Sequence, residues 1–250
     1  NTQPALLASS VAILRVLQEN GVEPVIVAGH SLGEYSALVA SCSLEYEDAM
    51  RLVRRRGEAM QEAVPVGQGS KAAILGLDDD EVRAAALQAS GEEVCTVANL
   101  NAPGQIVIAG HTRAVERTVD LCKEKGARRA ILRPVSAPFH SPLMAPARQV
   151  LTPFLQEATF ADPGVPVVTN IDARPATTGD AARDALSRQI DGPVRWVESV
   201  EWMAEAGGAE LFVEVGPGKV LTGLTKGVDD ITGVAIEEID VSKILEEVCS

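Results

Sequence analysis

A short apolar run that leads directly into a Gly-x-Ser-x-Gly turn is the feature that most constrains the fold of this chain. Residues 24–29 read "PVIVAG", residues 29–33 read "GHSLG", and the helical pattern "LGEYSALVASC" follows at 32–42. A continuous apolar run bounded by turn residues is typical of a strand that is covered on both faces. We therefore predict a strand, a tight turn and a helix, the repeating unit of α/β proteins.

Most of the remaining chain also alternates between strand and helix patterns, which favours a parallel sheet with helices on both faces. The segment 71–135 differs, because its pattern predicts strand, helix, strand, strand, helix and strand. That order is the split βαβ arrangement of a ferredoxin-like module. We therefore expect an α/β core made of residues 1–67 and 136–250, with residues 68–135 as an inserted subdomain.

Charge and composition exclude several classes of function. The 250 residues carry a net charge of -13, whereas nucleic-acid binding relies on clustered Lys and Arg. No apolar run approaches the roughly 18 residues that span a bilayer, and no basic leader precedes an apolar segment. We expect a cytoplasmic protein without a nucleic-acid or membrane partner. The four cysteines are far apart, so neither a zinc site nor a disulfide framework is predicted.

Ser31, at the centre of the turn, is the candidate nucleophile. In a nucleophile elbow the glycines let the backbone turn tightly, and the serine hydroxyl projects at the carboxyl end of the strand. The amide of Leu32 then points into the same space, where it would stabilise developing negative charge. The alternative is a serine that only caps the following helix, with glycines that serve close packing.

A nucleophilic serine needs a base, and the chain has only three histidines. His30 adjoins Ser31, and neighbouring side chains on a tight turn usually diverge, so we expect His30 to line the pocket. His111 precedes a predicted helix on the surface of the insert. His140 lies in a loop before a proline-initiated helix, where the carboxyl edge of the sheet would bring it near Ser31. We therefore predict that His140 is the base, although a loop histidine by itself is more often solvated or part of the core.

Arg56 interrupts an otherwise apolar helix face. The predicted helix from about Tyr46 to Ala63 places Ala49, Val53, Arg56 and Met60 on one face. A buried guanidinium without an anion is costly, so Arg56 either extends to water or faces a carboxylate. A substrate acyl group that carries a free carboxylate would explain the candidate nucleophile, the candidate base and the cation together.

The chain also carries five ordered, separately spaced motifs: "GHSLGEYSALVA", "RRRGEAMQEAVP", "NAPGQIVIAG", "PVSAPFHSPLM" and "EVGPGKVLTGL". Together they resemble the bacterial malonyl-CoA:acyl carrier protein transacylases over almost the whole chain. The resemblance implies an α/β-hydrolase-like core with a ferredoxin-like insert. It also implies that the protein takes a malonyl group from malonyl-CoA through a malonyl-serine and passes it to the phosphopantetheine thiol of acyl carrier protein, for fatty-acid or polyketide synthesis.

The resemblance assigns roles to individual residues. Ser31 is the nucleophile, His140 the base and Arg56 the ligand of the malonyl carboxylate. The backbone carbonyl of Gln189 orients the histidine, in the place of a triad acid. Three further residues are implied at the acyl pocket, of which Phe139 matches a pattern associated with malonyl selection: His30, Asn99 and Phe139.

The same resemblance implies no cofactor or metal beyond the two substrates, and a monomer is the expected state. Because the carrier protein is acidic, we expect local cations to dock it. The candidates are Lys123, Lys125, Arg128 and Arg129. Two rival functions remain open from the sequence: a serine hydrolase of the esterase or phospholipase class, and a noncatalytic carrier-binding module.

One departure from the family concerns the start of the sequence. Members of the family begin with a strand that ends in a "GQGS" motif, whose glutamine helps to form the oxyanion hole. This sequence starts downstream of that point, and its own "GQGS" at 67–70 follows the arginine helix. We expect either that a segment precedes the sequence or that the chain alone is poorly active, since one lost oxyanion donor costs about 3 kcal/mol in the transition state.

Overall fold

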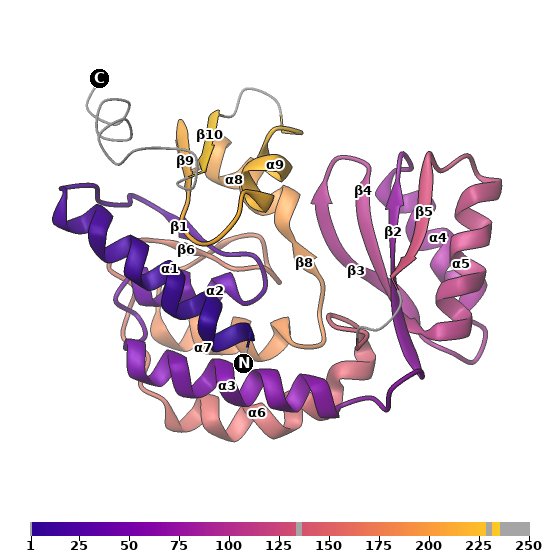
Figure 1. Cartoon of the computed structure of the whole chain (residues 1–250), viewed down its shortest axis with the longest axis horizontal. Coiled ribbons are helices and arrows are strands. Elements are labelled where there is room, and N and C mark those ends of the chain that lie inside the picture. The colour runs from indigo at the N-terminus through magenta and orange to yellow at the C-terminus, as the bar shows by residue number, and fades with distance from the viewer. Residues whose placement is uncertain (1, 134–136, 229–231, 236–250) are drawn as a thin grey trace.

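The chain forms a larger and a smaller lobe that lie side by side (Figure 1). The computed structural model describes residues 2–133, 137–228 and 232–235. Helices and both parallel and antiparallel strand pairs are present, so the mixed α/β class predicted from the sequence is confirmed.

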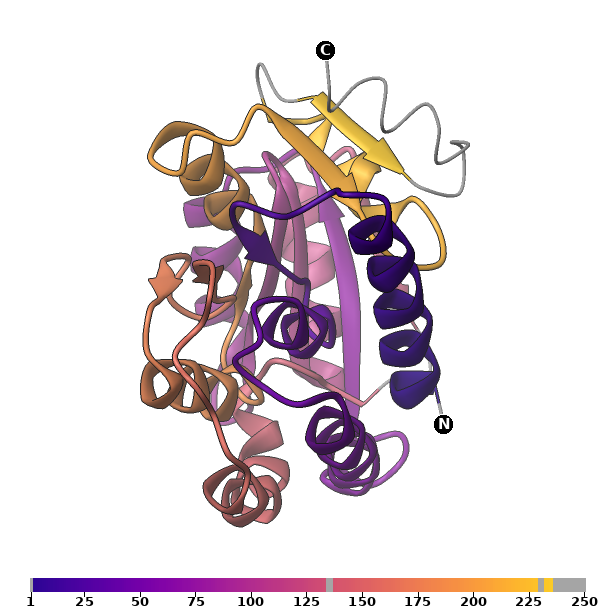
Figure 2. The ribbon, with the colours of Figure 1, turned by 90° about the vertical axis from the view of Figure 1, so that its left-hand side faces the viewer.

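Short strands at the centre of the larger lobe are surrounded by helices (Figures 1 and 2). Strand β1 (Val27–Ala28) pairs in parallel with β6 (Val167–Val168), and β6 pairs antiparallel with β7 (Pro175–Ala176). A second parallel pair joins β9 (Leu211–Glu214) to β10 (Thr232–Ala235). The helices of this lobe are α1 (Thr2–Glu19), α2 (Gly33–Ala40), α3 (Tyr46–Glu62), α6 (Ala145–Glu157), α7 (Gly179–Gln189), α8 (Trp196–Glu205), α9 (Val220–Thr225) and the 3-10 helix η1 (Pro142–Met144).

Strands β1 and β6 are shorter than the apolar runs "PVIVAG" and "PVVTNI" predict. Within the described part of the chain β1 has only β6 as a partner, so its ladder ends after two residue pairs. Val25, which belongs to the predicted strand, is 76% exposed. Apolar sequence marks a buried segment, but strand length also depends on a neighbouring backbone to pair with.

The smaller lobe is a sheet with two helices packed against one face (Figure 1). Its strands are joined in the order β5-β2-β4-β3-β8, and β8 (Val194–Arg195) comes from the larger lobe to pair in parallel with β3. The remaining pairs are antiparallel. In chain order the elements are β2 (Gly69–Leu75), α4 (Asp79–Ser90), β3 (Cys95–Ala102), β4 (Gln105–His111), α5 (Thr112–Glu124) and β5 (Arg129–Arg133).

Local sequence accounts for these helices. The α4 helix begins with a capping box in which Asp78 accepts from the Glu81 amide and Glu81 accepts from the Asp78 amide. The α5 helix buries one apolar face against the sheet, and its Val115 and Val119 belong to the apolar core of the smaller lobe. In the larger lobe, α3 and α6 bury their faces in a separate apolar core, and Arg56 is the charged exception on the buried face of α3.

Two further sequence predictions concern the cysteines and membrane-spanning segments. In the described part of the chain, Cys42, Cys95 and Cys122 are free thiols, and Cys249 lies outside it. Over the same residues, no helix combines the length and the apolar character that a bilayer crossing requires.

Candidate active site

Ser31 lies on a strained turn between β1 and α2. Its φ is +55°, a left-handed conformation that residues other than glycine rarely adopt. Gly29 makes the turn possible, because a Cβ there would lie 1.9 Å from the backbone carbon of Gly33. A Cβ on Gly33 would meet nothing within 4 Å. Only the first glycine of the motif is therefore required sterically.

Asn170 holds this turn in place from the neighbouring strand. It follows β6, which pairs with β1, so its fully buried side chain lies under the turn. Its Nδ2 donates to the Gly29 carbonyl at 2.7 Å, and its Oδ1 accepts from the Ser31 amide at 2.6 Å. One side-chain amide thus satisfies two backbone groups of the strained turn. The sequence analysis missed Asn170, although a polar residue at the carboxyl end of a buried strand was a usable signal.

His140 lies within hydrogen-bond distance of the Ser31 hydroxyl. The Ser31 Oγ to His140 Nε2 distance is 2.7 Å, and His140 Nδ1 lies 2.9 Å from the backbone carbonyl of Gln189. A carbonyl only accepts, so the ring proton resides on Nδ1 and Nε2 is free to accept from the hydroxyl. Burial, with the nearby charges of Lys71 and Arg56, holds the pKa of His140 well below its usual value. The imidazole is therefore neutral near pH 7, the form that a general base requires.

Arg56 reaches the same hydroxyl from α3. Its Nη2 donates to Ser31 Oγ and to Gln189 Oε1, each at 3.0 Å, and its Nη1 donates to Gln3 Oε1 at 2.8 Å. The residue is only 2% exposed, so the possibility that it extends to water is wrong. Among the described residues Arg56 forms no ion pair, and its Nε has no partner. A buried cation surrounded by neutral amides is suited to an anionic ligand.

Gln189 connects these groups through both its backbone and its side chain. Its Nε2 donates to the Ser31 carbonyl and to Glu34 Oε2, each at 2.9 Å. Because its carbonyl contacts His140 and its Oε1 contacts Arg56, one residue links the side chains of His140 and Arg56 to the backbone of Ser31.

Glu34 is a buried acid in this network that the sequence analysis did not single out. It is 1% exposed, and its Oε2 also accepts from the Asn170 amide at 2.9 Å. Its Oε1 has no partner among the described residues. Burial raises the pKa of Glu34 to about 7. Its hydrogen bonds go to Asn170 and Gln189, while His140 Nδ1 contacts the Gln189 carbonyl, so Glu34 does not take the place of a triad acid.

Of the other predicted pocket residues, His30 and Asn99 form no hydrogen bond with the Ser31 hydroxyl in the described part of the chain. His30 Nε2 is 2.9 Å from Asn101 Oδ1, and its ring packs at 5.6 Å from the ring of Trp196. Asn99 is buried on β3 and contributes none of the hydrogen bonds to Ser31, His140 or Arg56 among the described residues. The sequence analysis did not single out Asn101, and the place of Asn99 at the acyl pocket stays a prediction.

Leu32 and Phe139 are partly buried against the apolar core of the larger lobe. Leu32 caps α2 at its N-terminus, and Phe139 directly precedes His140. His111 precedes α5 in the smaller lobe, as predicted, and its Nδ1 accepts from the Val94 amide. Over the described residues, no cluster of three or more His, Cys, Asp or Glu side chains is arranged to hold a metal ion.

Comparisons with known proteins give one consistent result. The acyl transferase domain model matches residues 1–245. The chain is 54% identical over 239 residues to the malonyl CoA-acyl carrier protein transacylase of Escherichia coli K12, covering 95% of this chain and 77% of the relative. An acyl carrier protein S-malonyltransferase structure from Vibrio cholerae is 50% identical with a TM-score of 0.94, covering 98% of this chain and 80% of that one. The structure of a malonyl-transacylase in complex with a holo acyl-carrier protein of a type II polyketide synthase is 46% identical with a TM-score of 0.94. The match covers 100% of this chain and 81% of that one.

The steric difference between the two glycines of the turn gives a first prediction. We expect Gly29→Ala to lower the free energy of unfolding by about 3 kcal/mol or more, because backbone atoms would have to move. Gly33→Ala is the matched control and should change it by no more than about 1 kcal/mol, since the space is open. Urea unfolding of the two variants measures both values, and equal losses would contradict the steric argument.

The buried carboxyl of Glu34 predicts a pH-dependent stability. An unfolded glutamate ionises near 4.5, whereas Glu34 in the folded state keeps its proton until the pKa of about 7. The stabilisation that comes from the neutral Glu34 carboxyl is therefore fully present below pH 4.5 and is lost as the pH rises through 7. The free energy of unfolding of the wild type should therefore fall by about 2–3 kcal/mol between pH 5 and pH 8. We expect Glu34→Gln to abolish this fall.

Urea unfolding at pH 5 and pH 8 measures this difference for the wild type and for Glu34→Gln. The exposed Glu62 provides the control substitution Glu62→Gln, which should leave the wild-type pH dependence intact. The same pH dependence in wild type and Glu34→Gln would show that Glu34 is ionised throughout this range.

Proposed function

The chain belongs to the acyl transferase domain family, and we propose that Ser31 carries a malonyl group as a covalent ester between malonyl-CoA and acyl carrier protein. The protein is an acyltransferase that moves malonyl groups to acyl carrier protein, in fatty-acid or polyketide synthesis. The observation that carries the covalent step is the contact of the Ser31 hydroxyl with both a neutral imidazole and a buried guanidinium.

In the first half-reaction, Ser31 Oγ attacks the thioester carbon of malonyl-CoA while His140 Nε2 takes the hydroxyl proton. The tetrahedral oxyanion is stabilised by backbone donors, among which we place the Leu32 amide at the start of α2. The carbon-sulfur bond then breaks, and the imidazolium returns its proton to the coenzyme A sulfur. The Gln189 carbonyl, bonded to Nδ1, keeps the ring oriented and stabilises its charged form.

In the second half-reaction, the phosphopantetheine thiol replaces coenzyme A. His140 takes the thiol proton, the sulfur attacks the malonyl ester, and the Ser31 oxygen leaves and recovers the proton. Because the acyl group rests on the enzyme between two substrates, the kinetics are ping-pong.

Arg56 supplies acyl selectivity in this scheme. Its guanidinium lies 3.0 Å from the oxygen that carries the acyl group, so a malonyl carboxylate two bonds from the ester carbon falls within its reach. The partners of Arg56 are all neutral, which leaves its charge available to the substrate. Gln3 on α1 and Gln189 hold the guanidinium in place.

The architecture supports a finer description of the two lobes. We assign the larger lobe to an α/β-hydrolase-like core, because β1 leads through the Ser31 turn into α2 beside the parallel strand β6. We assign the smaller lobe to a ferredoxin-like insert, because its strand order β5-β2-β4-β3 joins a βαββαβ chain in antiparallel pairs. The boundaries 1–67, 68–135 and 136–250 stay predictions, as do a monomeric state, a cytoplasmic location and the absence of a cofactor.

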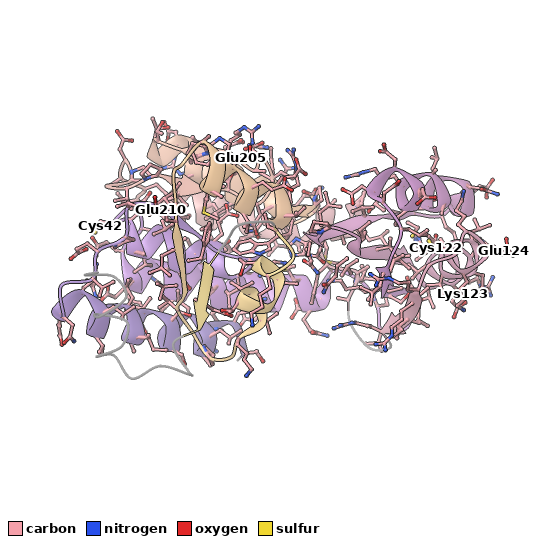
Figure 3. All side chains as sticks on the ribbon, turned by 90° about the horizontal axis from the view of Figure 1, so that it is seen from above. Cys42, Cys122, Lys123, Glu124, Glu205 and Glu210 are labelled. Atoms are coloured by element: carbon pink, nitrogen blue, oxygen red, sulfur yellow. The ribbon has the colours of Figure 1, made fainter. Side chains whose placement is uncertain are left out.

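The docking cations also stay a prediction. Lys123 lies at the end of the smaller lobe that is far from the larger lobe (Figure 3) and pairs with Asp120 at 3.0 Å. Both partners are exposed, and such pairs contribute little, so an acidic carrier protein can compete for this lysine.

The covalent step is tested by intact-mass spectrometry after brief exposure of the intact protein to malonyl-CoA. We expect a mass increase of one malonyl group that is absent in Ser31→Ala and is removed by holo acyl carrier protein. No adduct would favour a noncatalytic carrier-binding module. An adduct lost to water as fast as to the carrier would favour a hydrolase.

A second prediction concerns Arg56. We expect Arg56→Ala to raise the activation free energy of malonyl transfer by about 3 kcal/mol, because the carboxylate would lose its buried partner. This increase lowers kcat/KM for malonyl transfer roughly 100-fold. Acetyl transfer should fall far less, since an acetyl group has no carboxylate.

The control for Arg56→Ala is Arg54→Ala, on the exposed face of the same helix, where Arg54 pairs only with Glu58. That variant should leave both transfer rates near the wild-type values. Equal losses of malonyl and acetyl transfer in Arg56→Ala would remove Arg56 from the selective role.

A further inference from the structure

Lys71 is a mostly buried lysine that faces the larger lobe from the sheet of the smaller lobe. Its neighbours on β2, Ala72 and Ile74, belong to the apolar core of the smaller lobe. Side chains alternate along the strand, so Ala72 points into that core and Lys71 points to the opposite face of the sheet. There its Nζ lies 5.5 Å from the centre of the Phe139 ring. Phe139 directly precedes His140, so the ammonium group lies beside the proposed active site.

The charged and titratable groups around Lys71 are all basic. Arg133 is opposite it on β5, Arg56 comes from α3, and His140 and His30 are close enough for the lysine charge to lower their pKa values. Burial, Arg133 and Arg56 together lower the pKa of Lys71 to about 8. Among the described residues, the ammonium group forms no ion pair and no hydrogen bond, and it packs against the ring of Phe139.

This arrangement of cations opposes folding. A desolvated ammonium group without a counterion opposes folding, and a second cation nearby adds repulsion. Methionine has a similar length and would pack beside Phe139 without either penalty. A position that holds two unpaired cations, Lys71 from one lobe and Arg56 from the other, is suited to a substrate that brings the missing negative charge.

Resting on the proposed function, we propose that Lys71 is a specificity-determining residue that acts with Arg56 to select acyl groups bearing a carboxylate. Arg56 contacts the serine oxygen directly, whereas Lys71 adds a second positive charge on the side of the pocket formed by Phe139. The charge favours malonyl over acetyl because only malonyl carries an anion. The alternative is a lysine whose ammonium group extends to water and has no effect on selectivity.

The proposal predicts a distinctive pH dependence. Lys71 is cationic below its pKa of about 8 and neutral above it. The preference for malonyl over acetyl should therefore fall as the pH rises through 8. The second-order acylation rate reports the free enzyme, so this is the relevant pKa. A lysine with only a structural role would not produce such a change in preference.

The test measures acylation of Ser31 in the intact protein by malonyl-CoA and by acetyl-CoA, with rapid quenching and intact-mass detection from pH 6.5 to 9.5. Lys71→Met should lower the malonyl-to-acetyl ratio at pH 7 by on the order of tenfold and make it independent of pH around 8. Lys71→Arg, which stays charged, should keep the preference up to the highest pH. Arg83→Met, at an exposed position on α4, is the control and should keep the wild-type ratio.

Folding is checked by thermal unfolding, where Lys71→Met should match or exceed the wild-type Tm because an unpaired charge is removed. A wild-type ratio in folded Lys71→Met would overturn the role of Lys71 while malonyl-Ser31 formation in the wild type still supports the proposed function. If the wild type itself forms no malonyl adduct, both the proposed function and this inference fail.

Discussion

Arg56 carries a positive charge at a position from which water is nearly excluded, and its surroundings tolerate that charge without neutralising it. Gln3, Gln189 and Ser31 each accept one of its hydrogen bonds, and none of them is an anion. An acidic side chain in their place would stabilise the charged guanidinium more strongly, but it would compete with the substrate carboxylate. The side-chain amides therefore accept the hydrogen bonds of a buried guanidinium, and because they are neutral they leave its charge available to an anionic ligand.

Amide groups also hold the proposed nucleophile and the proposed base in place. Asn170 secures the left-handed turn at Ser31, and the Gln189 carbonyl secures His140, whose own φ of +63° is also left-handed. Strained conformations of this kind persist only when neighbouring groups over-determine them. Glu34, the acid within this network, has a pKa near 7 and binds the amides rather than the imidazole. Burial, together with the positive charges of Lys71 and Arg56, therefore keeps His140 neutral even though a carboxyl group lies in the same network.

The sequence was sufficient for the parts of the site that local patterns mark. Ser31 follows from its turn, Arg56 from a charged residue on an apolar helix face, and His140 from elimination among three histidines. Asn170, Glu34 and Lys71 were not predicted, because their significance comes from contacts across more than one element. An acid in a first helical turn or a lysine on a strand is ordinarily solvated. The strands β1 and β6 were predicted, but their short length was not, because a local apolar run does not show which backbone pairs with it.

The two lobes are joined at the site, and this connection explains why the smaller lobe matters for chemistry. Strand β8 of the larger lobe extends the sheet of the smaller lobe beside β3, which carries Asn101 against His30. On the same sheet, β2 carries Lys71 against Phe139. The smaller lobe therefore contributes Asn101 and Lys71 beside the proposed site, while Ser31, His140 and Arg56 come from the larger lobe. On the proposed role of Lys71, a substitution at this position of β2 is expected to alter which acyl group is accepted while the hydrogen bonds of Asn170 still hold the turn at Ser31.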